Sequence, residues 1–90
     1  MQIHFSKIIQ FSRQLKAGNR QREFNFKKLN NADPEQFSVN VSDERGERIL
    51  FSMKKHDNRW EVVPGQIPSW IVQSEDKLHE IIEDELTQIN

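Results

Sequence analysis

Four stretches of the chain carry an apolar residue at every second position, and this alternation constrains the fold more than any other feature. A period of two places the apolar side chains on one face of a β-strand and the polar ones on the other. Short links rich in Asn, Asp, Pro and Gly separate the runs and favour antiparallel neighbours. The sequence therefore predicts a four-stranded antiparallel meander. Its strands cover Arg20–Leu29, Gln36–Asp43, Glu47–Lys55 and Asn58–Val63.

One face of this predicted sheet collects almost all of its large apolar side chains. They are Phe24, Phe26, Phe37, Val39, Val41, Ile49, Phe51, Met53, Trp60 and Val62. The other face carries amides, hydroxyls and mixed charges, with Leu50 as its main apolar member. The apolar face must be covered by other elements, whereas the polar face is expected to meet water.

Two amphipathic segments are available as that cover. Residues 1–16 contain no Pro or Gly. At 100° per residue, six of their apolar side chains fall within an arc of roughly 160°: Met1, Phe5, Ile8, Ile9, Phe11 and Leu15. Gly18 and Asn19 can end such a helix in left-handed conformations. Alternation at Met1, Ile3 and Phe5 leaves a short strand before the helix open, but the helix is the favoured interpretation.

A second helix is expected after the break at Pro64-Gly65, with Ser74 as a candidate N-cap. Its apolar stripe is formed by Ile71, Leu78, Ile81, Ile82, Leu86 and Ile89. The predicted fold is a single α+β domain over residues 1–90, a two-layer sandwich of order α-β-β-β-β-α. Both helices lie on one face of the meander.

The composition indicates the cellular compartment in which such a domain is expected. Only 34% of the residues are hydrophobic, there is no Cys, and no stretch approaches the apolar length that spans a bilayer. A small secreted domain usually relies on disulfides, so their absence favours a reducing compartment. The first residues also lack the pattern of a signal peptide. We expect a cytoplasmic protein with a thin stability margin and no membrane contact.

The sequence shows no motif for catalysis, a cofactor or a phosphate-binding loop, so we expect a protein that is not an enzyme. Glu75, His79 and Glu83 are spaced one helical turn apart and could line up as metal ligands. A helix rich in acids produces this spacing by chance, and a real site needs converging, supported ligands. No metal and no cofactor are therefore predicted.

Charge is divided along the chain. Residues 1–30 carry seven basic side chains and one acid, and the remaining sixty carry six basic and thirteen acidic ones. Internal complementarity is the favoured explanation. The alternative is binding of nucleic acid or another polyanion through the basic segment 16–28. That alternative would use Lys16, Arg20, Arg22, Lys27 and Lys28. The aromatic residues are needed in the core, which disfavours a base-stacking sheet.

Two apolar groups exceed what one packing stripe needs, and they make a protein partner the leading expectation. Phe5 and Ile9 lie on the first predicted helix, and Ile67 and Trp70 lie in the connector after Pro64-Gly65. A homodimer would relieve the small core. The competing interpretation, favoured for the connector, is that it plugs the open end of the sandwich. The leading functional hypothesis is a small non-catalytic interaction module that self-associates.

Overall fold

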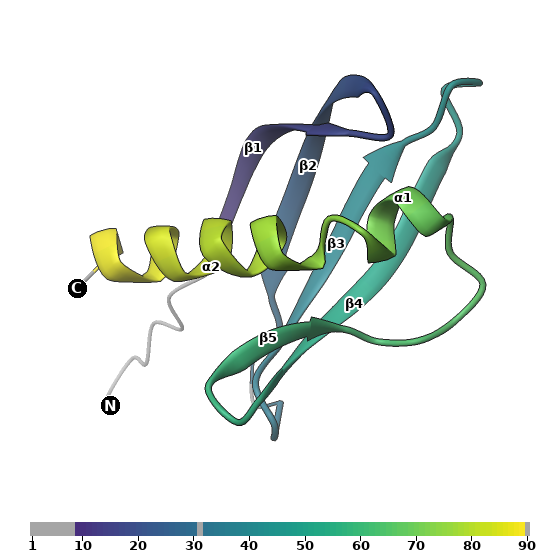
Figure 1. Ribbon diagram of the computed structural model, residues 1–90. Coiled ribbons are helices and arrows are strands. Elements are labelled where there is room, and N and C mark those ends of the chain that lie inside the picture. Colours follow the sequence, from purple (N-terminus) through teal and green to yellow (C-terminus); the bar gives the residue numbers. More distant parts are fainter. Residues whose placement is uncertain (1–8, 31, 90) are drawn as a thin grey trace, which may run out of the picture.

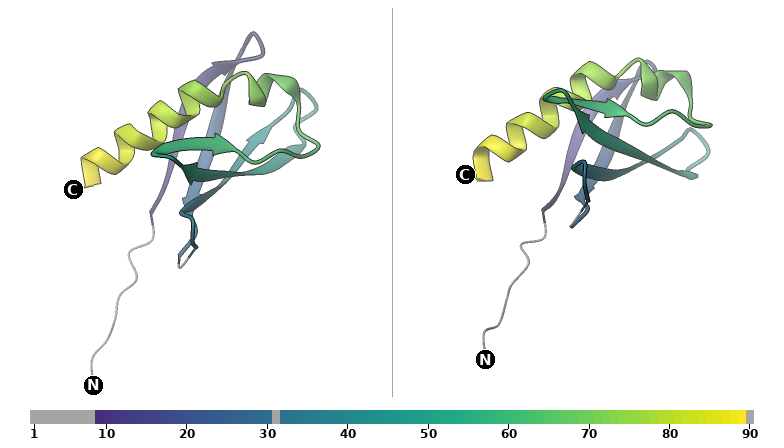
Figure 2. Two further views of the ribbon diagram at one scale, coloured as in Figure 1. Left: turned by 60° about the horizontal axis from the view of Figure 1, so that its bottom comes forward. Right: turned by 90° about the horizontal axis from the view of Figure 1, so that it is seen from below.

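The computed structural model describes residues 9–30 and 32–89 and contains seven elements. The strands are β1 Gln10–Ala17, β2 Arg20–Lys28, β3 Gln36–Ser42, β4 Arg48–His56 and β5 Arg59–Val62. The helices are α1 Ser69–Val72 and α2 Glu75–Ile89. The strands form one antiparallel sheet in the order β1-β2-β3-β4-β5. The sheet curls, and both helices lie over the same face of it (Figures 1 and 2).

The α+β class and the antiparallel meander are thus confirmed, but the predicted first helix is wrong over Gln10–Ala17. That segment is an eight-residue strand paired along its whole length with β2. The sheet has five strands instead of four, and the order is β-β-β-β-β-α-α. The first eight residues of the predicted helix lie outside the described part of the chain.

The reason for this error lies at Gly18 and Asn19. Their φ values are +61° and +66°, and Ala17 pairs directly with Arg20. Two central residues with positive φ make the tight hairpin turn whose twist suits antiparallel strands. The same conformations also end helices, so the pair was compatible with either structure. Asp57 and Asn58, at +50° and +64°, build the corresponding turn between β4 and β5.

The core lies between the sheet and α2, as the alternation predicted. Nine residues of the apolar sheet face are buried, and Ile49 is half-buried. Phe37 packs edge-on against Trp60 with ring centroids 5.0 Å apart, and Phe11 stacks on Phe26 at 4.7 Å. We call this helix-covered side the inner face. Leu50, on the opposite outer face, is 67% exposed.

The second predicted helix is divided. A four-residue turn, α1, precedes α2, and the buried Ser74 lies between them. The Ser74 hydroxyl donates to the carbonyl of Trp70 at 2.7 Å, and so it holds the junction of the two helices. Neither described helix has the length and apolar character that crossing a membrane requires.

Candidate functional site: the two edges of the sheet

The β5 edge of the sheet is closed by side chains of α2. Val63 N–H donates to the Ser52 carbonyl at 2.9 Å, which identifies the odd-numbered residues as those hydrogen-bonded to β4. The amides of Trp60 and Val62 therefore point away from β4. Val62 N–H donates to Glu75 Oε2 at 2.8 Å, and Trp60 N–H donates to His79 Nδ1 at 3.0 Å. The second bond requires an unprotonated Nδ1. Both outward amides of β5 therefore have an acceptor.

The match between helix and strand is geometric. Successive outward amides on a strand are about 6.8 Å apart, two residues along. Side chains one turn apart on a helix, such as Glu75 and His79, are spaced by about 6 Å along its axis. One face of α2 can thus serve two amides in a row. Of the three possible metal ligands noted in the sequence, Glu75 and His79 instead accept hydrogen bonds from β5. The described residues contain no group of three or more acids and histidines placed to hold a metal.

The β1 edge differs. Lys28 N–H donates to the Ile9 carbonyl at 2.9 Å, which identifies the odd-numbered residues of β1 as those bonded to β2. The backbone N–H and C=O groups of the even-numbered residues point away from the sheet. Within residues 9–30 and 32–89, none of these groups has a hydrogen-bond partner. The residues are Gln10, Ser12, Gln14 and Lys16.

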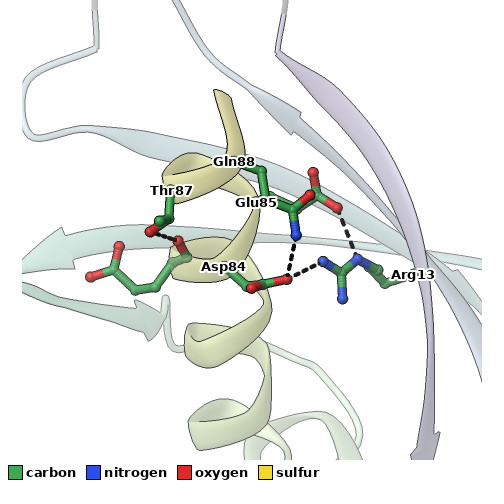
Figure 3. A network of polar contacts seen from close by, with 6 residues as sticks. Arg13, Asp84, Glu85, Thr87 and Gln88 are labelled. Atoms are coloured by element: carbon green, nitrogen blue, oxygen red, sulfur yellow. Dashed lines mark hydrogen bonds and ion pairs between the residues drawn. The ribbon is translucent and has the colours of Figure 1, made fainter. Parts of the chain in front are cut away.

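An ion-pair cluster joins the middle of β1 to the C-terminal half of α2 (Figure 3). Arg13 Nε donates to Glu85 Oε1 at 2.8 Å, and its Nη2 donates to Asp84 Oδ2 at 2.5 Å. Hydrogen bonds from Asp84 and Glu85 raise the pKa of Arg13 above its ordinary value. With its side chain 33% exposed, the guanidinium contributes only modestly to stability. It links the middle of β1 to the C-terminal half of α2.

Helix α2 extends beyond the β1 edge, where its C-terminal turns project past the sheet (Figures 1 and 2). Burial along its apolar stripe falls in the same direction. Leu78 and Ile82 are completely buried, whereas Leu86, one turn further, is only half-buried. A shallow groove of about 410 Å³ lies between β1 and α2, where Leu15 and Ile81 supply its apolar surface and charged side chains the rest. The C-terminal part of α2 therefore extends beyond the sheet that the rest of the helix covers.

The partner-binding residues predicted from the sequence do not form one exposed surface. Phe5 lies outside the described residues. Ile9, Ile67 and Trp70 are partly buried and pack against the core. A Cβ added at Gly18 would lie 3.0 Å from Trp70 Cβ, so this turn approaches the indole closely. Trp70 thus packs against the β1–β2 turn and against Arg22.

The five predicted polyanion-binding residues are dispersed. Arg22 is 6% exposed and donates to the carbonyls of Ala17 and Ser42 at 2.8 and 3.3 Å, and to Glu44 Oε1 at 2.5 Å. Its guanidinium also lies 3.9 Å from the centre of the Trp70 ring. This arginine is part of the folded framework.

The other four basic residues do not converge either. Lys28 pairs with Glu35 at 2.9 Å. Lys16 and Arg20 are exposed near the β1–β2 turn, whereas Lys27 is exposed towards the far end of β2. Seven residues of strand separate Arg20 from Lys27, which is about 23 Å.

The outer face of the sheet is polar and bonded to itself. Ser12 donates to Asn25 at 2.5 Å, Asn25 to Asn40 at 3.0 Å, and Arg48 to Asn40 at 2.6 Å, so one row crosses four strands. A shallow hollow of about 420 Å³ beside it is lined by residues of both charge signs, including Glu23 and Arg48. The expected polar face is confirmed, and it concentrates no single sign of charge.

The sequence interpretation did not find the β1 edge, whose outward groups have no partner among the described residues, because it placed this segment in a helix. One signal could have revealed it. Apart from Ile8, every apolar residue from Met1 to Leu15 has an odd number, so the period of two continues into the segment that becomes β1. Arg13 interrupts the pattern, and only the position of Asp84 and Glu85 explains why a charge is accepted on the inner face.

Comparison with protein-family models, with curated proteins and with solved structures finds no match to this chain. The geometry of the two edges is therefore the basis for the functional argument.

Proposed function

We propose that this chain is a small, non-catalytic interaction module that self-associates, and that its contact region is the β1 side of the domain. A single observation carries the proposal. The fold closes one sheet edge with two side-chain acceptors and leaves the other with outward backbone groups that have no partner among the described residues. Unpaired strand edges are templates for pairing with another chain.

The features of the β1 edge strengthen this proposal. Proteins that avoid edge pairing commonly use prolines, bulges, inward charges or very short strands at their edges. β1 has eight residues, no Pro and no Gly. Its one inward charge, Arg13, is already neutralised by Asp84 and Glu85. The C-terminal turns of α2 extend past β1 (Figure 1), and Leu86 in this part of the helix is only half-buried, so part of its apolar surface is available to a partner at this edge.

Light scattering on purified protein at micromolar concentration tests the proposal. We expect a mass near twice the 10.7 kDa of the chain, falling on dilution. Gln14→Pro removes one outward N–H without touching a β1–β2 hydrogen bond, and it should give a monomer. Gln14→Ala, the matched control, keeps the amide and should remain a dimer.

Trp70→Ala separates self-association from stability. Because Trp70 packs against Gly18 and Arg22, this variant should unfold more easily yet keep the dimer mass. A wild-type protein that is monomeric throughout the micromolar range would refute the proposal. A dimer unaffected by Gln14→Pro would move the contact region away from β1.

No particular observation favours the alternative of polyanion binding, because Arg22 is buried and the exposed cations Lys16, Arg20 and Lys27 are spread over β1 and β2. It stays a prediction, and a titration with oligonucleotides at low salt addresses it. Oligonucleotide binding that weakens in Arg20→Glu and Lys16→Glu would support polyanion binding.

A further inference from the structure

Resting on the proposed self-association, we infer that two copies join β1 to β1 in antiparallel fashion, about a two-fold axis at Arg13, to form one continuous sheet. Three independent features of β1 lead to this arrangement: the direction of its backbone groups, the order of its side chains, and the helix that extends beyond it.

The backbone restricts the register. Only even-numbered residues direct their N–H and C=O groups outward, so even residues must pair with even residues of the second copy. This also keeps the inner faces of both copies on the same side. When the axis lies at Arg13, Gln10 pairs with Lys16 and Ser12 with Gln14, and every outward group of β1 has a partner. Moving the axis by one residue leaves one end of the described strand unpaired.

The side chains are arranged symmetrically about the same residue. On the inner face Phe11 and Leu15 lie two positions either side of Arg13, so a two-fold axis there brings Phe11 of each copy against Leu15 of the other. Both side chains are half-buried in the single chain. The two Arg13 side chains would adjoin, but each already holds the carboxylates of Asp84 and Glu85. On the outer face the pairs contain no acid, and Lys16 meets an uncharged Gln10.

The helix overhang supplies the cover. A strand added at the β1 edge would expose its inner-face apolar side chains to water if no helix covered them. Here the C-terminal turns of α2 extend past β1 (Figures 1 and 2). Leu86 in this part of the helix packs against the chain's own core but is only half-buried, so part of its apolar surface is available to a second copy. A strand of general sequence would gain the same backbone bonds, but it would not gain the paired Phe11–Leu15 contacts. A second copy of this chain is the occupant that the pattern fits.

Cysteine cross-linking tests the register, because the chain has no native Cys. In the inferred arrangement Ser12 of one copy lies opposite Gln14 of the other, at a Cα separation of about 5.5 Å that a disulfide can span. Ser12 opposite Ser12 would be displaced by two residues along the strands, giving roughly 9 Å, which is too far. Ser12→Cys and Gln14→Cys proteins should therefore cross-link when mixed by refolding together and oxidised.

Each variant oxidised alone should give no more dimer band than Lys54→Cys, an exposed position on the outer face of β4 that controls for random collision. Circular dichroism before oxidation verifies that all three variants fold. Efficient cross-linking of Ser12→Cys alone, or of Gln14→Cys alone, would overturn the axis at Arg13.

Light scattering on the same samples separates this inference from the proposed function. A dimer mass without any cross-link in the mixture would refute β1–β1 pairing and leave self-association intact. A monomer mass in the wild-type protein would refute both.

Discussion

The two edge strands of this sheet are treated in opposite ways. β5 is a four-residue strand, and its two outward amides are hydrogen-bonded to Glu75 and His79 of α2. β1 is twice as long, and its outward groups have no partner among the described residues. The same helix contacts both strands, because its N-terminal half closes β5 and its C-terminal half is held to β1 by Arg13.

This difference has a physical origin in the length and path of α2. Its first turns bring Glu75 and His79 to the backbone amides of β5, and the helix then crosses the inner face towards β1 (Figure 1). At β1, Asp84 and Glu85 contact the side chain of Arg13 instead of the strand backbone. In this domain α2 therefore closes the β5 edge, and the outward backbone groups of β1 have no partner among the described residues.

The largest effect is expected from removing an aromatic side chain at each edge, because the two side chains differ in burial. Trp60 on β5 is fully buried, so Trp60→Ala should lower the free energy of unfolding by about 3–5 kcal/mol. Phe11 on β1 is half-buried, so Phe11→Ala should cost roughly half as much in dilute, monomeric protein. Urea denaturation measures both. The Phe11→Ala effect should grow with protein concentration, and equal losses for both variants in dilute protein would contradict the contrast.

The next test concerns the support of the β1–β2 hairpin. Arg22→Ala removes the donors that satisfy the Ala17 and Ser42 carbonyls and the cation stacked on Trp70, and it should cost about 2–3 kcal/mol. The exposed Glu44 partner adds little to this. Arg20→Ala, exposed two residues away, is the matched control and should stay within about 0.5 kcal/mol of wild type. Similar losses in both variants in thermal or urea unfolding would show that Arg22 is not structural.

A smaller effect is expected from opening the closed edge. Glu75→Ala leaves the Val62 N–H without its acceptor and should cost about 1–2 kcal/mol, with faster hydrogen exchange at that amide. Glu75→Gln retains a carbonyl acceptor and should lose less. Glu80→Ala, exposed on the same helix, is the control. Unchanged exchange at Val62 in Glu75→Ala would mean that the edge is closed by something other than this carboxylate.

The smallest effect is a dependence on acid. The hydrogen bond from Lys28 holds the pKa of Glu35 below its ordinary value near 4.5, and the hydrogen bond from Arg22 does the same for Glu44. A lowered folded-state pKa stabilises the fold above about pH 4.5, and this stabilisation is lost as pH falls through the lowered value. Both carboxylates are largely exposed, so the change should be modest.

Glu35→Gln and Glu44→Gln should flatten this acid dependence in unfolding measurements between neutral pH and pH 3. If neither glutamate variant changes the dependence of unfolding free energy on pH, groups other than Glu35 and Glu44 cause the acid sensitivity.

Much of the sheet could be predicted from the sequence because alternation is a local property. The runs that became β2 to β5 were located to within one or two residues, and their buried and exposed faces were assigned correctly. The short links rich in Asn, Asp, Pro and Gly were also expected, and the one at Asp43–Gly46 has Gly46 at a positive φ of 81°. Each of these features depends on neighbouring residues alone, so no knowledge of distant contacts was needed.

β1 was mispredicted because two periods fit the same few residues. Phe11 and Leu15 are four apart, which suits one face of a helix and one face of a strand equally well. Gly18-Asn19 ends a helix or turns a hairpin with the same left-handed backbone. Pairing with β2 decides between them, because the strand gains a complete ladder from Gln10 to Ala17 whereas an isolated helix of this length is marginal.

The sequence by itself determined the period of the strands, the composition of the two sheet faces and the apolar stripe of the last helix, since these follow from the spacing of residues along the chain. Only the tertiary structure decided that Arg22 is buried, that Glu75 and His79 close one edge, and that the outward groups of the other edge have no partner among the described residues. Those outcomes depend on where α2 crosses the sheet, and hence on contacts between residues that are far apart in sequence.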